Sequence, residues 1–164
     1  MGDFRERLRQ IRQRAGKENE RLAQERSEEK RRARETTGRV DRAAEEVEAH
    51  IEHCLKELQS EFVEFRFDAH TRDGRNIRVH WDEPCVGTDG TQEKIFHQLS
   101  FQVQRYYEYA DVEVVAKAIV RNQDRRRCAH EEDVWDGDPK RLFPFVEREI
   151  LEFTKLYTSP EEDA

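Results

Sequence analysis

Alternation between hydrophobic and polar residues is strongest in Glu93–Arg121, where it predicts two long strands joined at Tyr106–Asp111. In the first strand, Leu99, Phe101 and Val103 alternate with polar residues. The matching apolar positions of the second strand are Val112, Val114, Ala116, Ala118 and Val120. A period of two is that of a strand with one buried face. We therefore expect this hairpin to form the middle of an antiparallel sheet.

Shorter segments with the same alternation lie on either side of this hairpin. Val63–Asp68 and Ile77–Trp81 flank Asp73-Gly74, and an Asp-Gly pair between two alternating runs is a strong hairpin signal. The remaining segments are predicted as a loop at Pro84–Gly90, a turn at Asn122–Arg125 and a short polar edge strand at Arg126–Glu132. Together they predict an antiparallel meander of about five strands.

Two further stretches have hydrophobic residues at the spacing of amphipathic helices. The stripe of the first consists of Val40, Ala44, Val47, Ile51, Cys54, Leu55, Leu58 and Phe62. The second follows Asp138-Pro139, which supplies an N-cap and a proline at the first helical position. Its stripe consists of Leu142, Val146, Ile150, Phe153 and Tyr157. Pro144 lacks a backbone N–H and predicts a separate or kinked first turn.

These elements predict an α+β fold with two layers, in which both amphipathic helices cover one face of the meander. The expected core contains Phe65, Phe67, Val79, Trp81, Leu99, Phe101, Val103, Val114, Ile150 and Phe153. The other face is open and mostly polar, with Glu64, Arg66, Arg78, His80, Gln98, Ser100, Gln102, Gln104, Lys117 and Arg121. Val115 and Ile119 on that face, and Leu151 outside the last helical stripe, are a candidate dimer surface because a monomer leaves them unpartnered.

The chain divides into a charged N-terminal arm (residues 1–37), a globular domain (38–159) and an acidic tail (160–164). Lys17–Glu35 predicts a solvated helical spacer or a partly disordered one, because it has many oppositely charged pairs one turn apart but little apolar stripe. Thr36-Thr37-Gly38 predicts a break before the first amphipathic helix of the domain.

The first turns of the arm predict a basic amphipathic helix. Phe4, Leu8 and Ile11 fall on one stripe at helical spacing. Three arginines flank this stripe: Arg5, Arg9 and Arg12. An apolar stripe bordered by arginines suits docking on a surface that combines an apolar groove with carboxylates.

Charge is distributed unevenly between the arm and the rest of the chain. The arm has 12 Lys and Arg against 8 Asp and Glu, a net charge of +4, and the remaining residues have 18 against 29, a net charge of −11. This asymmetry predicts an anionic partner. We expect a protein-protein interaction module whose arm docks on an acidic protein surface, first of all in its own homodimer or larger oligomer. The alternatives are RNA or ribosome phosphates, an anionic membrane surface, and a small-ligand pocket above Ala116 and Ala118.

Candidate catalytic and metal-binding residues are few. His50 and Cys54 are one helical turn apart and could share a zinc ion, but the sequence offers no two further ligands for it. His80, Cys85 and His97 are a second group of candidate metal-ligating residues. The acidic cluster Glu131–Asp138 lacks EF-hand spacing. Since there is also no phosphate loop or nucleophile motif, the sequence predicts no catalytic residue, metal or cofactor.

The cysteine content and the hydrophobic runs bear on the compartment. The three cysteines form no CxxC pair and cannot all be joined in disulfides, which predicts a reducing environment. No apolar run approaches the ~20 residues that span a bilayer. The sequence therefore predicts a cytoplasmic protein without a transmembrane segment.

Overall fold

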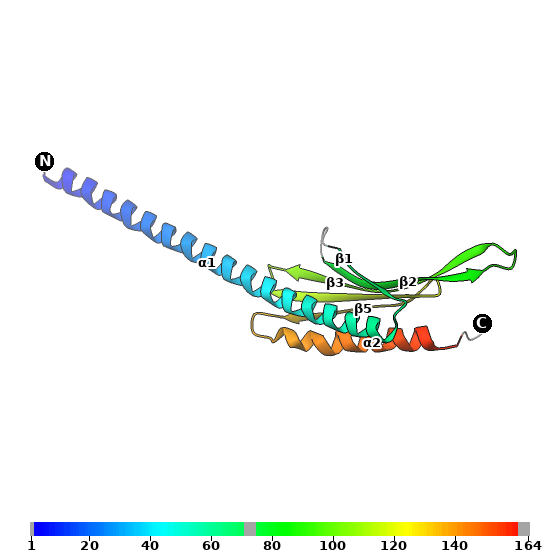
Figure 1. The fold of residues 1–164 in the computed structure, drawn as a ribbon. Coiled ribbons are helices and arrows are strands. Elements are labelled where there is room, and N and C mark those ends of the chain that lie inside the picture. The colour runs from blue at the N-terminus through cyan, green and yellow to red at the C-terminus, as the bar shows by residue number, and fades with distance from the viewer. Residues whose placement is uncertain (1, 71–74, 161–164) are drawn as a thin grey trace. The chain divides into compact units, whose positions relative to one another are not determined.

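The computed structural model describes residues 2–70 and 75–160. Within this part of the chain it contains a long helix, a five-stranded sheet and a C-terminal helix (Figure 1). The elements are α1 (Gly2–Glu61), β1 (Arg66–His70), β2 (Asn76–Val86), β3 (Gln92–Tyr106), β4 (Asp111–Val120), β5 (Gln123–Asp133), a 3-10 turn (Pro139–Leu142) and α2 (Phe143–Thr158). Each strand pairs antiparallel with the next. The predicted α+β meander with an N-terminal helical arm is confirmed.

The chain forms two compact units, residues 1–38 and 39–164, and their boundary falls within α1. We call the second unit the body. The predicted break at Thr36-Thr37-Gly38 is wrong, and the charged spacer before it is helical. Thr36 lies within the helix, where its Oγ1 donates to the carbonyl oxygen of Arg32 at 2.9 Å. One glycine costs about 1 kcal/mol relative to alanine, too little to interrupt a long run of good helix formers.

The core of the body lies between the sheet and the helices, and the body part of α1 and α2 cover the same face of the sheet (Figure 1). Phe101 is fully buried at its centre, where Ile77 on β2 and Ala116 on β4 lie opposite it. The predicted core is confirmed at most positions, while Phe67 and Trp81 are partly buried and pack against it. The alternation therefore gave the correct register across the central strands.

In the body, α1 and α2 run side by side in the same direction. Arg39 reaches Trp135 near their beginnings, and Phe62 meets Tyr157 near their ends, with ring centroids 5.8 Å apart. The regular part of α2 follows a separate 3-10 turn, in agreement with the separate first turn predicted from Pro144. Contacts between residues more than 90 positions apart therefore hold the helix layer together.

Each helix also buries one carboxylate that arginines hold. Glu48 of α1 is 2% exposed and accepts from Arg75 Nη1 at 2.9 Å and from Arg105 Nη2 at 3.2 Å. Glu149 of α2, also 2% exposed, accepts from Arg126 Nε on β5 at 2.6 Å. Since a buried charge is costly without partners, these bonds fix where each helix sits on the sheet.

Two predicted boundaries around the first hairpin change in the structure. Residues 63–65 form the turn after α1, and β1 begins at Arg66. Glu64 consequently leaves the open face and accepts from the Tyr157 hydroxyl at 2.7 Å. The predicted loop Pro84–Gly90 is strand up to Val86, because the strand pairing of β2 with β3 continues that far. The predicted Asp73-Gly74 turn lies outside the described residues.

The turn between β4 and β5 is shorter than predicted. It consists of Arg121 and Asn122, both with positive φ (52° and 64°), so the predicted turn at Asn122–Arg125 is wrong and β5 begins at Gln123. Two consecutive positive φ values are those of the two-residue hairpin turn that matches strand twist. Arg121 leaves the open face as a result, and its Nη2 donates to the Ser159 carbonyl oxygen at 2.6 Å, beyond the end of α2. Ser100, also predicted on that face, is 9% exposed.

Candidate functional site

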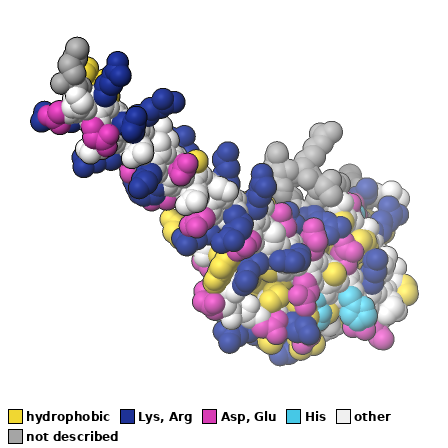
Figure 2. Space-filling model, turned by 90° about the vertical axis from the view of Figure 1, so that its left-hand side faces the viewer, with side chains coloured by type: hydrophobic (Ala, Val, Ile, Leu, Met, Phe, Trp, Pro, Cys, Tyr) yellow, Lys and Arg dark blue, Asp and Glu magenta, His cyan; other side chains and the backbone are white. Residues whose placement is uncertain are grey.

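The arm presents the apolar stripe that the sequence predicts. Phe4, Leu8 and Ile11 are 68%, 50% and 63% exposed on α1. Arg5 and Arg12 are also exposed, and Arg9 lies 3.7 Å from Glu6 in an ion pair whose two side chains are both more than half exposed. In Figure 2, Lys and Arg side chains are spread along α1 with acidic side chains among them. The arm therefore exposes an apolar stripe together with long, adaptable cationic side chains.

The open face of the sheet has an acidic end. Asp111 pairs with Asp133, and Glu113 pairs with Glu131, across β4 and β5. Like charges directly opposite each other destabilise a sheet. The pKa of Glu131 is raised, first by a hydrogen bond shared with Asp111 and then by slight desolvation and the neighbouring carboxylates. This end of the face is therefore suited to a cation.

We expect Glu131→Gln to raise the melting temperature at neutral pH. The folded pKa of Glu131 lies above its ordinary value of 4.5, so the wild-type protein loses stability as the pH rises through that raised pKa. The variant has no such loss, and the difference between the two should vanish at about pH 3, where the carboxyl is protonated. Thermal melts across this range measure the effect. As a control, Asp124→Asn removes an ion pair with Lys117 and should not stabilise; equal melting of wild type and Glu131→Gln at neutral pH would contradict the expectation.

The structure separates the three residues of the candidate dimer surface. Val115 and Ile119 are half-buried on the open face of β4. Leu151 is 60% exposed on α2, which packs against the opposite face of the sheet. Each would therefore need its own partner surface. Val115 lies opposite Ala129 and next to the acidic end, so apolar and acidic side chains adjoin on the open face.

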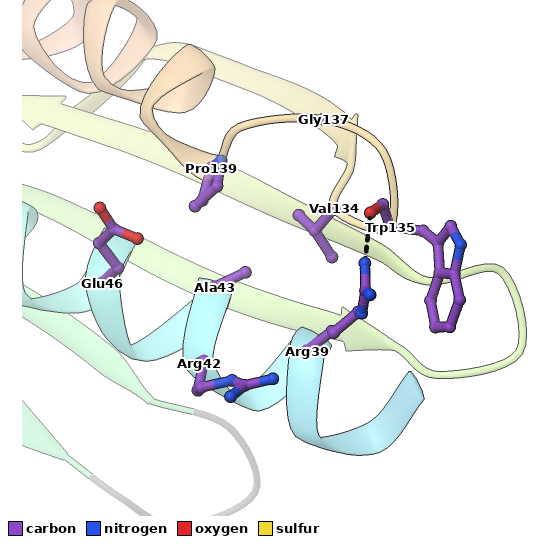
Figure 3. A pocket seen from close by; sticks show the side chains of 8 residues that line it. All are labelled: Arg39, Arg42, Ala43, Glu46, Val134, Trp135, Gly137 and Pro139. Carbon is purple, nitrogen blue, oxygen red and sulfur yellow. Dashed lines mark hydrogen bonds between the residues drawn. The ribbon is translucent and has the colours of Figure 1, made fainter. Parts of the chain in front are cut away.

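A shallow pocket of about 370 Å³ lies where the start of the body's α1 segment meets the connection after β5 (Figure 3). It is lined by Arg39, Arg42, Ala43, Glu46, Val134, Trp135, Gly137 and Pro139. Arg39 donates to the Trp135 carbonyl oxygen at 2.8 Å and stacks on the indole, 4.1 Å from its centroid. No sequence pattern indicates this pocket, because its two sides lie about 90 residues apart in the chain. Ala116 and Ala118, the residues of the alternative small-ligand pocket, are each 2% exposed in the core.

His97 is buried and has partners at both ring nitrogens. Its Nδ1 accepts the backbone N–H of Arg121 at 3.2 Å, so Nε2 carries the hydrogen and donates to Glu83 at 2.9 Å. It also packs against Tyr157 in an aromatic cluster. These contacts give His97 a structural role in the β3–β4 region. In the acidic connection after β5, Asp138 also has a structural role. It caps the 3-10 turn by accepting a hydrogen bond from the backbone N–H of Lys140.

His50 and Cys54 do meet on α1, as their spacing predicts, and α2 adds Glu147 beside them. His50 Nε2 lies 3.1 Å from Glu147 Oε1 and 3.5 Å from Cys54 Sγ, and all three ligand atoms lie within 4.8 Å of one another. Burial, together with Glu147 and Glu57, raises the pKa of the Cys54 thiol to about 11. The free thiol is thus protonated at neutral pH, which argues against a nucleophilic role.

Comparison with protein-family models, curated proteins and solved structures finds no match for this chain. Among the described residues, no helix combines the length and hydrophobicity that crossing a membrane requires. What the described residues offer is an exposed amphipathic helix, an acidic end of the sheet, a shallow pocket and a group of three metal-ligating side chains.

Proposed function

We propose that this protein is a non-enzymatic interaction module whose arm docks on an acidic protein surface, with a second copy of the chain as the first candidate. The observation that supports this most strongly is the exposure of Phe4, Leu8 and Ile11 on one stripe of α1. Burying a side chain of this kind gains roughly 1.5–3 kcal/mol. An amphipathic helix docks through apolar anchors of this spacing. The resulting assembly is a homodimer or a larger oligomer.

The acceptor that we favour is the acidic end of the open face in a second copy. Its facing carboxylates repel one another, and arginines from the arm would reduce that repulsion while Phe4, Leu8 and Ile11 cover the adjoining Val115 and Ala129. The net charges of +4 for the arm and −11 for the remaining residues favour the same pairing. Exposed ion pairs contribute only ~0–1 kcal/mol each and are screened by salt. The apolar anchors therefore dominate affinity, and the charges set approach and orientation.

Two variants of the full chain distinguish this proposal from RNA binding. Changing Phe4, Leu8 and Ile11 to serine is expected to convert the assembly to monomer, since every 1.4 kcal/mol lost weakens association about tenfold. Changing Arg5, Arg9 and Arg12 to glutamine should slow association and remove much of its salt dependence, yet leave assembly at high protein concentration. Sedimentation velocity measures the assembly, and the fluorescence anisotropy of a labelled single-stranded RNA measures nucleic-acid binding.

The matched control changes three polar residues of the same helix, Gln10, Gln13 and Gln24, to serine, and it should assemble like the wild type. Helix content from circular dichroism has to agree between the two serine variants. If the apolar-to-serine variant keeps its assembly state while the glutamine variant loses RNA, the RNA- or ribosome-associated alternative replaces the docking proposal. A wild-type chain that is monomeric at all concentrations rejects self-docking, and docking then requires a different acidic protein.

A further inference from the structure

Three different metal-ligating side chains point to one spot between α1 and α2. His50 and Cys54 come from successive turns of α1, and Glu147 comes from α2. The His50 ring lies flat on Phe143, with centroids 3.8 Å apart and planes 6° from parallel, and its side chain is 17% exposed. The imidazole is therefore held in one orientation, with Nε2 directed at the other two ligands.

A single hydrogen bond at His50 Nε2 does not serve both of the groups beside it. His50 Nε2 carries either one hydrogen or one lone pair, so it can form only one good hydrogen bond. Two groups nevertheless approach it, Glu147 Oε1 at 3.1 Å and Cys54 Sγ at 3.5 Å. A cation placed among the three atoms would bind all of them at once.

The distances also fit the geometry of a tetrahedral ion. Zinc binds nitrogen and oxygen at ~2.0–2.2 Å and sulfur at ~2.3 Å, which separates neighbouring ligand atoms by roughly 3.3–3.6 Å. The two separations from His50 Nε2 are 3.1 and 3.5 Å, and all three atoms lie within 4.8 Å of one another. The Glu147 side chain is 56% exposed, so a change of rotamer can adjust the distance between its carboxylate oxygen and Cys54 Sγ.

We propose that His50, Cys54 and Glu147 bind a divalent zinc ion that joins α1 to α2, with water as the fourth ligand on the exposed side. Thiolate, imidazole and carboxylate together favour zinc over the oxygen-preferring magnesium and calcium. Binding takes the thiol proton into solvent and leaves a thiolate on the metal. Because the ligands come from both helices, the bound ion stabilises the folded body. This site is independent of the proposed arm docking.

Cobalt(II) and zinc titrations of the metal-stripped full chain test the proposal. We expect one cobalt ion per chain and a cobalt–thiolate charge-transfer band in the near ultraviolet, which zinc then displaces. Cys54→Ser and His50→Ala should abolish the band. Glu147→Gln should weaken binding by at least about tenfold, since even the loss of an outer partner of a metal ligand commonly costs that much. Zinc should raise the melting temperature of the wild type and not that of these variants.

Matched controls are available in the same chain. Cys85→Ser and Cys128→Ser remove the other free cysteines, and His53→Ala removes the neighbouring exposed histidine, which faces Glu57 instead. All three should retain the band and its affinity. A wild-type chain that gives no cobalt–thiolate band, or a band that survives Cys54→Ser, overturns the proposal. If Cys54→Ser fails to fold, protection of Cys54 from alkylation by zinc in the wild type, compared with Cys85 and Cys128, decides in its place.

Discussion

Replacing Phe101 with alanine is expected to lower the free energy of unfolding by ~3–5 kcal/mol, in the range of large-to-small changes at buried aromatic positions. Phe101 is 0% exposed and sits on the central strand β3, where Ile77 and Ala116 lie opposite it on the two neighbouring strands. Because Ile77 and Ala116 belong to paired strands, they can move only partly into the space that the lost ring leaves. Urea denaturation of the two proteins measures the difference.

The control for this prediction is Gln102→Ala, one residue further along β3 on the open face. Because successive strand residues point to opposite faces, the control removes a half-buried polar side chain and should cost less than about 1 kcal/mol. Similar losses at the two positions would mean that the faces of β3 are assigned incorrectly. A small effect at Phe101 alone would mean that the core can repack there.

The second large effect is expected at the carboxylate buried in α1. Replacing both Arg75 and Arg105 with methionine leaves Glu48, 2% exposed, without its two arginine partners. Breaking a buried ion pair from one side typically costs about 3–5 kcal/mol, because the remaining charge stays desolvated. We expect a loss of this size in urea denaturation at neutral pH.

A triple variant checks that the loss comes from the uncompensated charge. Adding Glu48→Met to the double variant should recover most of the stability, because an apolar group tolerates the site that an isolated carboxylate does not. Arg148→Met is the matched control: its side chain is 58% exposed, and Glu149 keeps its bonds from Arg126. It should cost less than about 1 kcal/mol. No recovery in the triple variant would place the loss in arginine packing.

The sheet could be predicted because its signal is local. Alternation in Glu93–Arg121 depends only on which face is buried, and a slip of one residue would bury the glutamines, so the pattern specifies register. The boundaries that failed depend on tertiary contacts. Residues 63–65 alternate like a strand but form the turn after α1, where Phe65 is buried beside Phe153 and Tyr157. The helix break failed because one glycine is a weak interruption.

The candidate functional residues also divide into those that a local pattern predicts and those that depend on tertiary contacts. The exposed stripe of the arm and the His50/Cys54 spacing were visible in the sequence, because both depend on one helix. Glu147 could not be predicted as their neighbour, because a single sequence does not show which face of α2 lies against α1. His50 and Glu147 are 97 positions apart in the chain. The buried carboxylates left a signal that could have been used: Glu48 lies within the apolar stripe between Val47 and Ile51, and Glu149 precedes Ile150. A charged residue inside such a stripe indicates a buried ion pair.

The strand order has a consequence for how the molecule folds. Every strand pairs with its neighbour in the chain, so the sheet can grow hairpin by hairpin with short loops to close. The helix layer is different, because the contacts of α2 with α1 and with the turn after it join residues 93 to 97 positions apart. The last element of the chain thus covers apolar surface that every earlier element leaves open. Without α2 in place, the sheet and α1 expose the apolar surface that α2 covers, and exposed apolar surface of this kind favours aggregation.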